Sequence, residues 1–185
     1  MNITVYLGSE FGFKPIYAEK VRELGIMIGS KGHRLVYGGG NVGLMGLLAD
    51  SVLASGGTVI GVIPDFFLES EQQHCGITDL EIVSSMSERK NRMIELGDFF
   101  LAFPGGIGTL EEITEIMTRK KLHIGTEEYA FYNLNGYYDN LERMLDTMYS
   151  EGFLSESARK QIRFVEDLDE LNRILDYLEK ENAEA

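Results

Sequence analysis

Short apolar runs alternate with amphipathic stretches along the whole chain. The apolar runs have the length and composition of β-strands, and the stretches between them space their apolar residues as helices do. The predicted strands span residues 3–8, 33–40, 57–64, 80–86, 98–106 and 128–133, with a short edge strand over 163–167. The predicted helices span residues 14–31, 43–55, 87–96, 109–122, 137–152 and 168–181.

This alternation predicts right-handed βαβ units that assemble into a parallel sheet. Several of the strands are nearly continuous apolar runs, which is typical of a sheet covered by helices on both faces. We therefore predict an α/β fold, in which residues 1–185 form a single domain around a doubly wound, Rossmann-like parallel sheet. Ligands bind such sheets at the carboxyl ends of the strands, so the loops that leave those ends are where a site is expected.

Composition supports one globular, intracellular domain. A chain of 185 residues with 44% apolar residues can bury a core of its own. Its single cysteine, Cys75, excludes an intrachain disulfide. No run approaches the 18 apolar residues of a membrane helix, and the N-terminal segment lacks a basic leader. We expect a cytoplasmic protein with no membrane partner.

The charge distribution indicates a small anionic ligand. A net charge of −13 argues against nucleic-acid binding, because phosphate backbones require a basic surface. Cations concentrate nevertheless in two short segments, residues 89–92 and 119–121. A small anion would account for these clusters, and two solvated helix faces are the alternative.

The segment YGGGNVGLMG has the spacing G-x-G-x-x-G at Gly38, Gly40 and Gly43, between a predicted strand and a predicted helix. Glycines there permit a tight turn and bring backbone N–H groups close to a phosphate. The alternative is that they serve only positive φ angles and close helix packing. The segment follows the second strand rather than the first, which weakens a dinucleotide-binding interpretation.

Two further segments carry candidate chemistry. PGGIGTLEE, residues 104–112, leads from a strand into a helix whose N-terminus would bind an anion, with the Thr109 hydroxyl as a donor. Alternatively, Thr109 and Glu112 form a capping box.

MSERKNRM, residues 86–93, places Arg89 and Lys90 near a helix N-terminus, where cations are disfavoured unless an anion lies nearby. The alternative is that Arg89 pairs with Glu88, Glu95 or a neighbouring loop.

Taken together, YGGGNVGLMG, MSERK and PGGIGTLEE resemble the LOG family, the cytokinin riboside 5′-monophosphate phosphoribohydrolases. The likeness runs from YLGS, through NLNGYYDNL, to about residue 175. It implies an enzyme that hydrolyses the N-glycosidic bond of AMP, or of an N6-modified AMP, to free base and ribose 5-phosphate. It also implies a homodimer whose sites lie near the interface.

The resemblance implies roles for particular residues. Arg89 and Glu112 match the catalytic pair. The matching substrate-binding positions are Glu71, Lys90, Gly105, Gly106, Ile107, Gly108, Thr109, Glu111 and Thr118. The chain departs from the family at Ser87 and over residues 118–125, where members contact the base or the dimer partner. These departures leave the choice of base open.

The expected chemistry requires neither cofactor nor metal. Cleavage of an N-glycosidic bond builds positive charge on the ribose, which the Glu112 carboxylate can stabilise. His33, His74 and His123 are scattered without metal-ligand spacing. Three alternatives remain: a domain that senses a nucleotide without cleaving it, an NAD-dependent oxidoreductase, and a decarboxylase that holds pyridoxal phosphate on Lys90.

Overall fold

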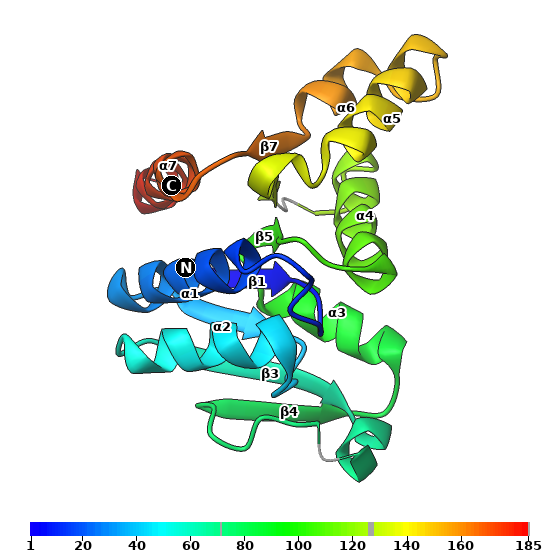
Figure 1. The fold of residues 1–185 in the computed structure, drawn as a ribbon. Coiled ribbons are helices and arrows are strands. Elements are labelled where there is room, and N and C mark those ends of the chain that lie inside the picture. The colour runs from blue at the N-terminus through cyan, green and yellow to red at the C-terminus, as the bar shows by residue number, and fades with distance from the viewer. Residues whose placement is uncertain (71, 126–127, 185) are drawn as a thin grey trace.

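The computed structural model describes residues 1–70, 72–125 and 128–184. Within these ranges, seven parallel strands form one sheet in the order β4-β3-β2-β1-β5-β6-β7 (Figure 1). The strands are β1 (Asn2–Tyr6), β2 (Arg34–Tyr37), β3 (Thr58–Pro64), β4 (Asp79–Val83), β5 (Phe99–Ala102), β6 (Glu128–Tyr132) and β7 (Arg163–Val165). This is the predicted doubly wound parallel sheet, with the predicted short strand at one edge.

Helices cover both faces of the sheet. They are α1 (Ile16–Ser30), α2 (Gly43–Ala54), α3 (Met86–Leu96), α4 (Ile107–Lys121), α5 (Asp139–Ser150), α6 (Glu156–Lys160) and α7 (Leu168–Glu184). Two short 3₁₀ helices are η1 (Asp65–Ser70) and η2 (Leu134–Gly136). Figure 1 shows α1, α2 and α7 on one side of the sheet and α3, α4 and α5 on the other. None of the described helices combines the length and apolar character that crossing a bilayer requires.

Two cores lie against the two faces of the sheet. Successive side chains of a strand point to opposite faces. Accordingly, Ile3 and Val5 of β1 pack in the core beneath α1, α2 and α7. Tyr6 packs in the other core, beneath α3 and α4, where its ring stacks on Phe100 with centroids 6.3 Å apart. The last residue of β1 therefore lies under the helices that carry Arg89 and Glu112.

The chain order creates a switch point between β1 and β5. From β1 the chain winds outward through β2 and β3 to β4, and α3 then returns it to β5 on the other side of β1. The loops that leave β1 and β5 thus diverge to opposite faces of the sheet. Such a divergence opens a crevice at the carboxyl ends of the two strands, which is where ligands bind in open α/β sheets.

Several elements differ from the sequence prediction. Helix α4 begins at Ile107, two residues before the predicted start, because Gly106 is its N-cap and no side chain caps it. Helix α6 was not predicted; it is five residues long and is capped by Ser155, whose hydroxyl accepts from the Ala158 N–H. Part of the predicted irregular segment 65–79 forms η1.

Candidate active site

Arg89 and Glu112 form a buried ion pair between α3 and α4. Arg89 Nη1 donates to Glu112 Oε1 at 2.9 Å, and each residue is only 7% exposed. Arg89 Nε donates to the Val62 carbonyl oxygen at the end of β3, at 3.1 Å. The guanidinium is therefore fixed on two sides, and it holds the Glu112 carboxylate in one orientation.

Gly38 makes room for this guanidinium. A β-carbon built on Gly38 would lie 2.0 Å from Arg89 Nη2, so any other residue would displace the arginine. Gly43, with φ +58°, lies against the Ser9 carbonyl oxygen, which a β-carbon there would approach to 1.8 Å. These contacts favour close packing over phosphate binding as the role of the G-x-G-x-x-G turn.

The structure decides two of the alternatives that the sequence left open. Glu88 caps the start of α3, because its Oε2 accepts from the Ser84 N–H at 2.8 Å, and it is not the partner of Arg89. Glu95 pairs with Arg92. A capping box between Thr109 and Glu112 does not form, since both residues lie inside α4 and Glu112 faces Arg89. The pair joins two helices across the site instead of serving either helix alone.

The pKa of the Glu112 carboxyl is raised above its ordinary value, chiefly because burial disfavours the charged form. Arg89 is the strongest influence that lowers this pKa, and Glu111 raises it further. The pKa of the nearby Tyr6 hydroxyl is also raised, chiefly by burial and then by the negative charge of Glu112. Tyr6 therefore stays neutral beneath the ion pair.

A second ion pair joins the same two helices nearer the surface. Lys90 Nζ contacts the carboxylates of Glu111 and Glu115, and the Glu115 oxygen lies at 3.1 Å. The hydrogen bond to Glu111, and then the one to Glu115, raise the pKa of Lys90. Lys90 and Glu111 are thus brought to the entrance of the predicted site, already paired with each other.

The turn between β5 and α4 exposes unpaired backbone donors. In the described part of the chain, the N–H groups of residues 107–109 have no acceptor, and the first bond of the helix runs from the Leu110 N–H to the Gly106 carbonyl. A β-carbon on Gly106 or Gly108 would meet nothing within 4 Å. Free N–H groups at a helix N-terminus form an anion site.

Gly105 and Thr109 support this turn from below. A β-carbon on Gly105 would lie 2.1 Å from Thr109 Oγ1, and the Thr109 side chain is buried. Tyr137 Oη donates to the Gly105 carbonyl oxygen at 2.6 Å. Tyr137 was not singled out from the sequence, although it lies in the family-like segment NLNGYYDNL. Its place in the connection that leaves β6, the strand next to β5, was the signal that could have identified it.

One predicted substrate contact, Thr118, is not brought to the Arg89–Glu112 pair. Thr118 is exposed three turns along α4, where its hydroxyl donates to the Thr114 carbonyl oxygen at 2.8 Å. It lines a separate, largely apolar cavity of about 310 Å³ formed with α5 and α6. Glu71 lies outside the described residues.

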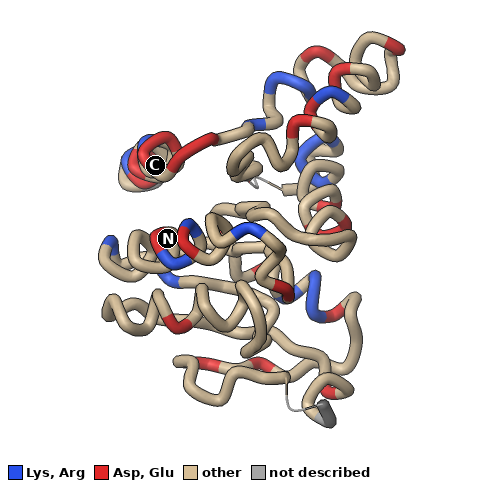
Figure 2. The backbone as a smooth tube through the Cα atoms, in the orientation of Figure 1, with Lys and Arg blue, Asp and Glu red and all other residues tan. Residues whose placement is uncertain are grey.

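The two cationic segments have different surroundings (Figure 2). In residues 89–92 each cation is paired with a carboxylate, as described for Arg89 and Lys90 and as Arg92 is with Glu81. Residues 119–121 form the last turn of α4, at the opposite end from the glycine-rich turn that precedes it. Cations there complement the helix dipole. Only the first segment belongs to the candidate site.

The histidines have separate environments. His74 is buried, with Nε2 3.0 Å from Asp50 Oδ1 and Nδ1 accepting from the Gly76 N–H. His33 is buried 3.3 Å from Glu179, and His123 is exposed just beyond α4. Among the described residues, no three His, Cys, Asp or Glu side chains are grouped as metal ligands.

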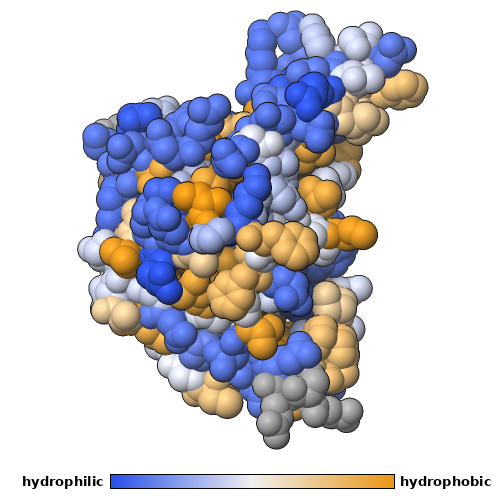
Figure 3. All heavy atoms as spheres, in the orientation of Figure 1, coloured by the Kyte–Doolittle hydropathy of each residue, from blue (hydrophilic) through white to orange (hydrophobic). Residues whose placement is uncertain are grey.

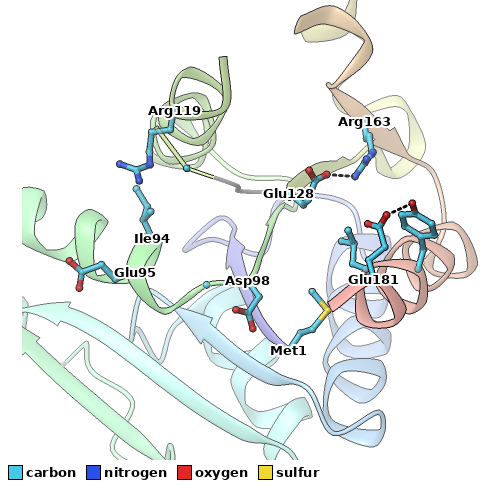
Figure 4. A pocket seen from close by; sticks show the side chains of 12 residues that line it. Met1, Ile94, Glu95, Asp98, Arg119, Glu128, Arg163 and Glu181 are labelled. Carbon is cyan, nitrogen blue, oxygen red and sulfur yellow. Dashed lines mark hydrogen bonds and ion pairs between the residues drawn. The ribbon is translucent and has the colours of Figure 1, made fainter. Parts of the chain in front are cut away.

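A larger cavity lies away from this chemistry. It measures about 700 Å³ and includes Met1, Asp98 and Glu128, next to or at the amino ends of β1, β5 and β6 (Figure 4). Figure 4 shows its Arg163 paired with Glu128 rather than pointing freely into the space. Because ligands bind parallel sheets at the carboxyl ends of the strands, the Arg89–Glu112 pair is the stronger candidate for an active site.

Comparisons with known proteins identify the family. A family model described as possible lysine decarboxylase matches residues 45–175. A probable cytokinin riboside 5′-monophosphate phosphoribohydrolase of Oryza sativa subsp. japonica is 38% identical over 183 residues, 99% of this chain and 82% of that protein. A cytokinin riboside 5′-monophosphate phosphoribohydrolase of Rhodococcoides fascians is 40% identical over 169 residues, 91% of this chain and 85% of that protein.

Solved structures share the fold. The molybdenum cofactor carrier protein of Chlamydomonas reinhardtii superposes with a TM-score of 0.73 over 96% of each chain, at 19% identity. At that identity the likeness concerns the fold alone. The family model and the sequence relatives go further: this chain belongs to the lysine decarboxylase-like family that includes the LOG-type phosphoribohydrolases.

Proposed function

We propose that this protein hydrolyses the N-glycosidic bond of AMP or an N6-substituted AMP. The observation that carries the proposal is the buried Glu112 carboxylate, fixed by Arg89 beside an α4 N-terminus with unpaired N–H groups. A nucleoside monophosphate offers one group for each part of this site: a phosphate for the turn and a reacting ribose carbon for the carboxylate.

Each part of the site has a role in the reaction. The N–H groups of residues 107–109 bind the 5′-phosphate and position the ribose against Glu112. As the bond from C1′ to the base breaks, positive charge develops on the ribose ring, and the Glu112 carboxylate stabilises it. Water adds its hydroxyl group to C1′, and its proton leaves with the base. Arg89 orients Glu112, and its charge favours the ionised carboxylate against the effect of burial.

The surroundings of Lys90 argue against a decarboxylase that holds pyridoxal phosphate on this residue. A Schiff base requires an unprotonated amine, and lysines that form one have a lowered pKa. The pKa of Lys90 is raised, since its ammonium group is held between the Glu111 and Glu115 carboxylates. The same pairing leaves Lys90 suited to a structural or ribose-proximal role.

Product analysis tests the proposal. Purified protein is incubated with AMP, with isopentenyladenosine monophosphate, or with adenosine, and free base and ribose 5-phosphate are measured by chromatography. We expect base release from the two monophosphates and little from adenosine, because adenosine leaves the phosphate turn empty. Binding of AMP without release of base over long incubation would refute the hydrolase and leave a nucleotide sensor.

A further inference from the structure

A second cavity lies at the switch point between β1 and β5. Its volume is about 320 Å³, within the range of small-molecule sites. Its walls are the turn after β1, the start of α2, the turn after β5 and the residue that follows η2. The residues that supply its side-chain walls are Phe11, Tyr17, Leu44 and Tyr137.

These walls are aromatic and held in place. The rings of Tyr17 and Tyr137 meet edge to face, with centroids 6.0 Å apart and planes at 84°. The hydrogen bond from Tyr137 Oη to Gly105 fixes one of them, and Leu44 is buried in the core beneath. Phe11, 51% exposed, stands at the mouth. Figure 3 shows apolar side chains among the polar ones in the middle of the molecular face drawn there.

The cavity and the reaction centre lie on opposite sides of one turn. Tyr17 and Leu44 pack with the core beneath α1 and α2, whereas Ile113, next to Glu112, packs with the core beneath α3 and α4. Residues 104–106 line the cavity and lead directly into α4. A phosphate bound at the start of α4 therefore has Glu112 on one side and the cavity on the other.

This arrangement sets what can occupy the cavity. In a nucleoside monophosphate whose phosphate lies at the turn and whose C1′ lies at Glu112, the base extends away from the cavity. What enters the cavity must be attached to the far side of the phosphate. Among the described residues that line it, only Glu10 is charged, so the cavity disfavours a further anion and suits an uncharged ring.

We propose that this cavity binds a nucleobase-type ring carried beyond the phosphate, so that the protein binds dinucleotides joined by a pyrophosphate more tightly than mononucleotides. The inference rests on the proposed function for the position of the phosphate. It concerns binding alone. Stacking of one base on aromatic side chains corresponds to a gain in affinity of about 5- to 150-fold.

Calorimetric titration with three ligands tests this. AMP, ADP and P1,P2-di(adenosine-5′) pyrophosphate are titrated into the Glu112→Gln protein, in which the ligands stay intact. We expect the dinucleotide to bind at least fivefold more tightly than AMP, and ADP to gain no such advantage, because its second phosphate carries no ring. Equal affinities for AMP and the dinucleotide, or an equal gain for ADP, would overturn the proposal.

Two neighbouring phenylalanines provide a matched comparison in the same background. Phe11→Ala removes a ring that lines the cavity, and Phe13→Ala removes a fully exposed ring of the same loop that does not. We expect Phe11→Ala to abolish most of the dinucleotide advantage without changing AMP affinity, and Phe13→Ala to preserve it. An advantage that survives Phe11→Ala, or that both variants remove equally, contradicts the proposal. Failure of AMP itself to bind would overturn the proposed function as well, which distinguishes the two.

Discussion

At the residue scale, Glu112 combines two opposing influences. Burial raises the pKa of its carboxyl, and Arg89 lowers it without restoring the ordinary value. A carboxyl whose pKa is higher in the folded than in the unfolded state stabilises the fold when it is protonated. This stabilisation is complete below the unfolded pKa, about 4.3 for glutamate, and is lost as pH rises through the folded pKa. At neutral pH the ionised carboxylate therefore costs folding free energy.

Substitution of Glu112 by glutamine should thus stabilise the fold at neutral pH. Glutamine keeps the shape and an acceptor for Arg89, and it carries no charge to bury. We expect the melting temperature of Glu112→Gln to exceed that of the wild type at pH 7.5, and the difference to disappear near pH 4. Thermal unfolding at the two pH values measures this; a lower melting temperature at pH 7.5 would contradict the account.

The two cations at the site should act unequally on Glu112. Arg89 lowers the pKa of Glu112 more than Lys90 does, because Arg89 is the direct partner. We expect Arg89→Met to raise this pKa further and Lys90→Met to raise it less. Carboxyl-carbon NMR titration of the two variants and the wild type reports the pKa without requiring turnover. An equal or larger shift in Lys90→Met would show that the buried pair does not control the carboxylate.

At the scale of elements, the glycine-rich turn depends on close packing. Gly43 and Gly56 both have positive φ, yet only Gly43 lies against a backbone, that of Ser9. We expect Gly56→Ala to cost about 1–2 kcal/mol from its left-handed conformation alone. Gly43→Ala should cost about 1–3 kcal/mol more, from overpacking. Urea unfolding of both variants measures the difference. Equal losses of unfolding free energy would contradict the account, because the Ser9 backbone would then move aside without a free-energy cost.

Much of the architecture follows from the sequence, because strands and helices have characteristic local periodicities of apolar residues. The predicted strand over 33–40 ended at Tyr37, where the glycines turn the chain instead of extending it. Local patterns also predicted the turn between β5 and α4, whose role as an anion site stays a prediction. They did not reveal α6, whose five residues are too few for a helical period.

The rest of the site depends on contacts that no local pattern encodes. The pairing of Arg89 with Glu112, 23 residues apart, entered through the family resemblance and not through periodicity. The Val62 carbonyl that fixes Arg89, and the ring wall built by Tyr17 and Tyr137, come from separate elements that only the strand order brings together. The sequence therefore predicted candidate residues for the chemistry, but not the contacts that hold them or the residues that surround them.

At the scale of the whole molecule, the family resemblance implies a homodimer, and exposed apolar side chains are candidates for its interface. Leu122 and Ile124, just beyond α4, are 58% and 60% exposed. We expect a homodimer by light scattering, and a shift toward monomer when both residues are replaced by aspartate. Ile26→Asp, at an exposed position on the opposite face of the sheet, should leave the dimer intact. A monomeric wild type at micromolar concentration would contradict this expectation.

The central claim is that a buried carboxylate performs the chemistry, and one comparison of two adjacent glutamates tests it most directly. Turnover of AMP is measured for Glu112→Gln and for Glu111→Gln, with AMP affinity determined by calorimetry for each. We expect Glu112→Gln to lower kcat by about 10²–10⁴-fold while still binding AMP, and Glu111→Gln, at a predicted substrate-binding position paired with Lys90, to weaken AMP binding while retaining most of kcat. Substantial turnover in Glu112→Gln would contradict the account.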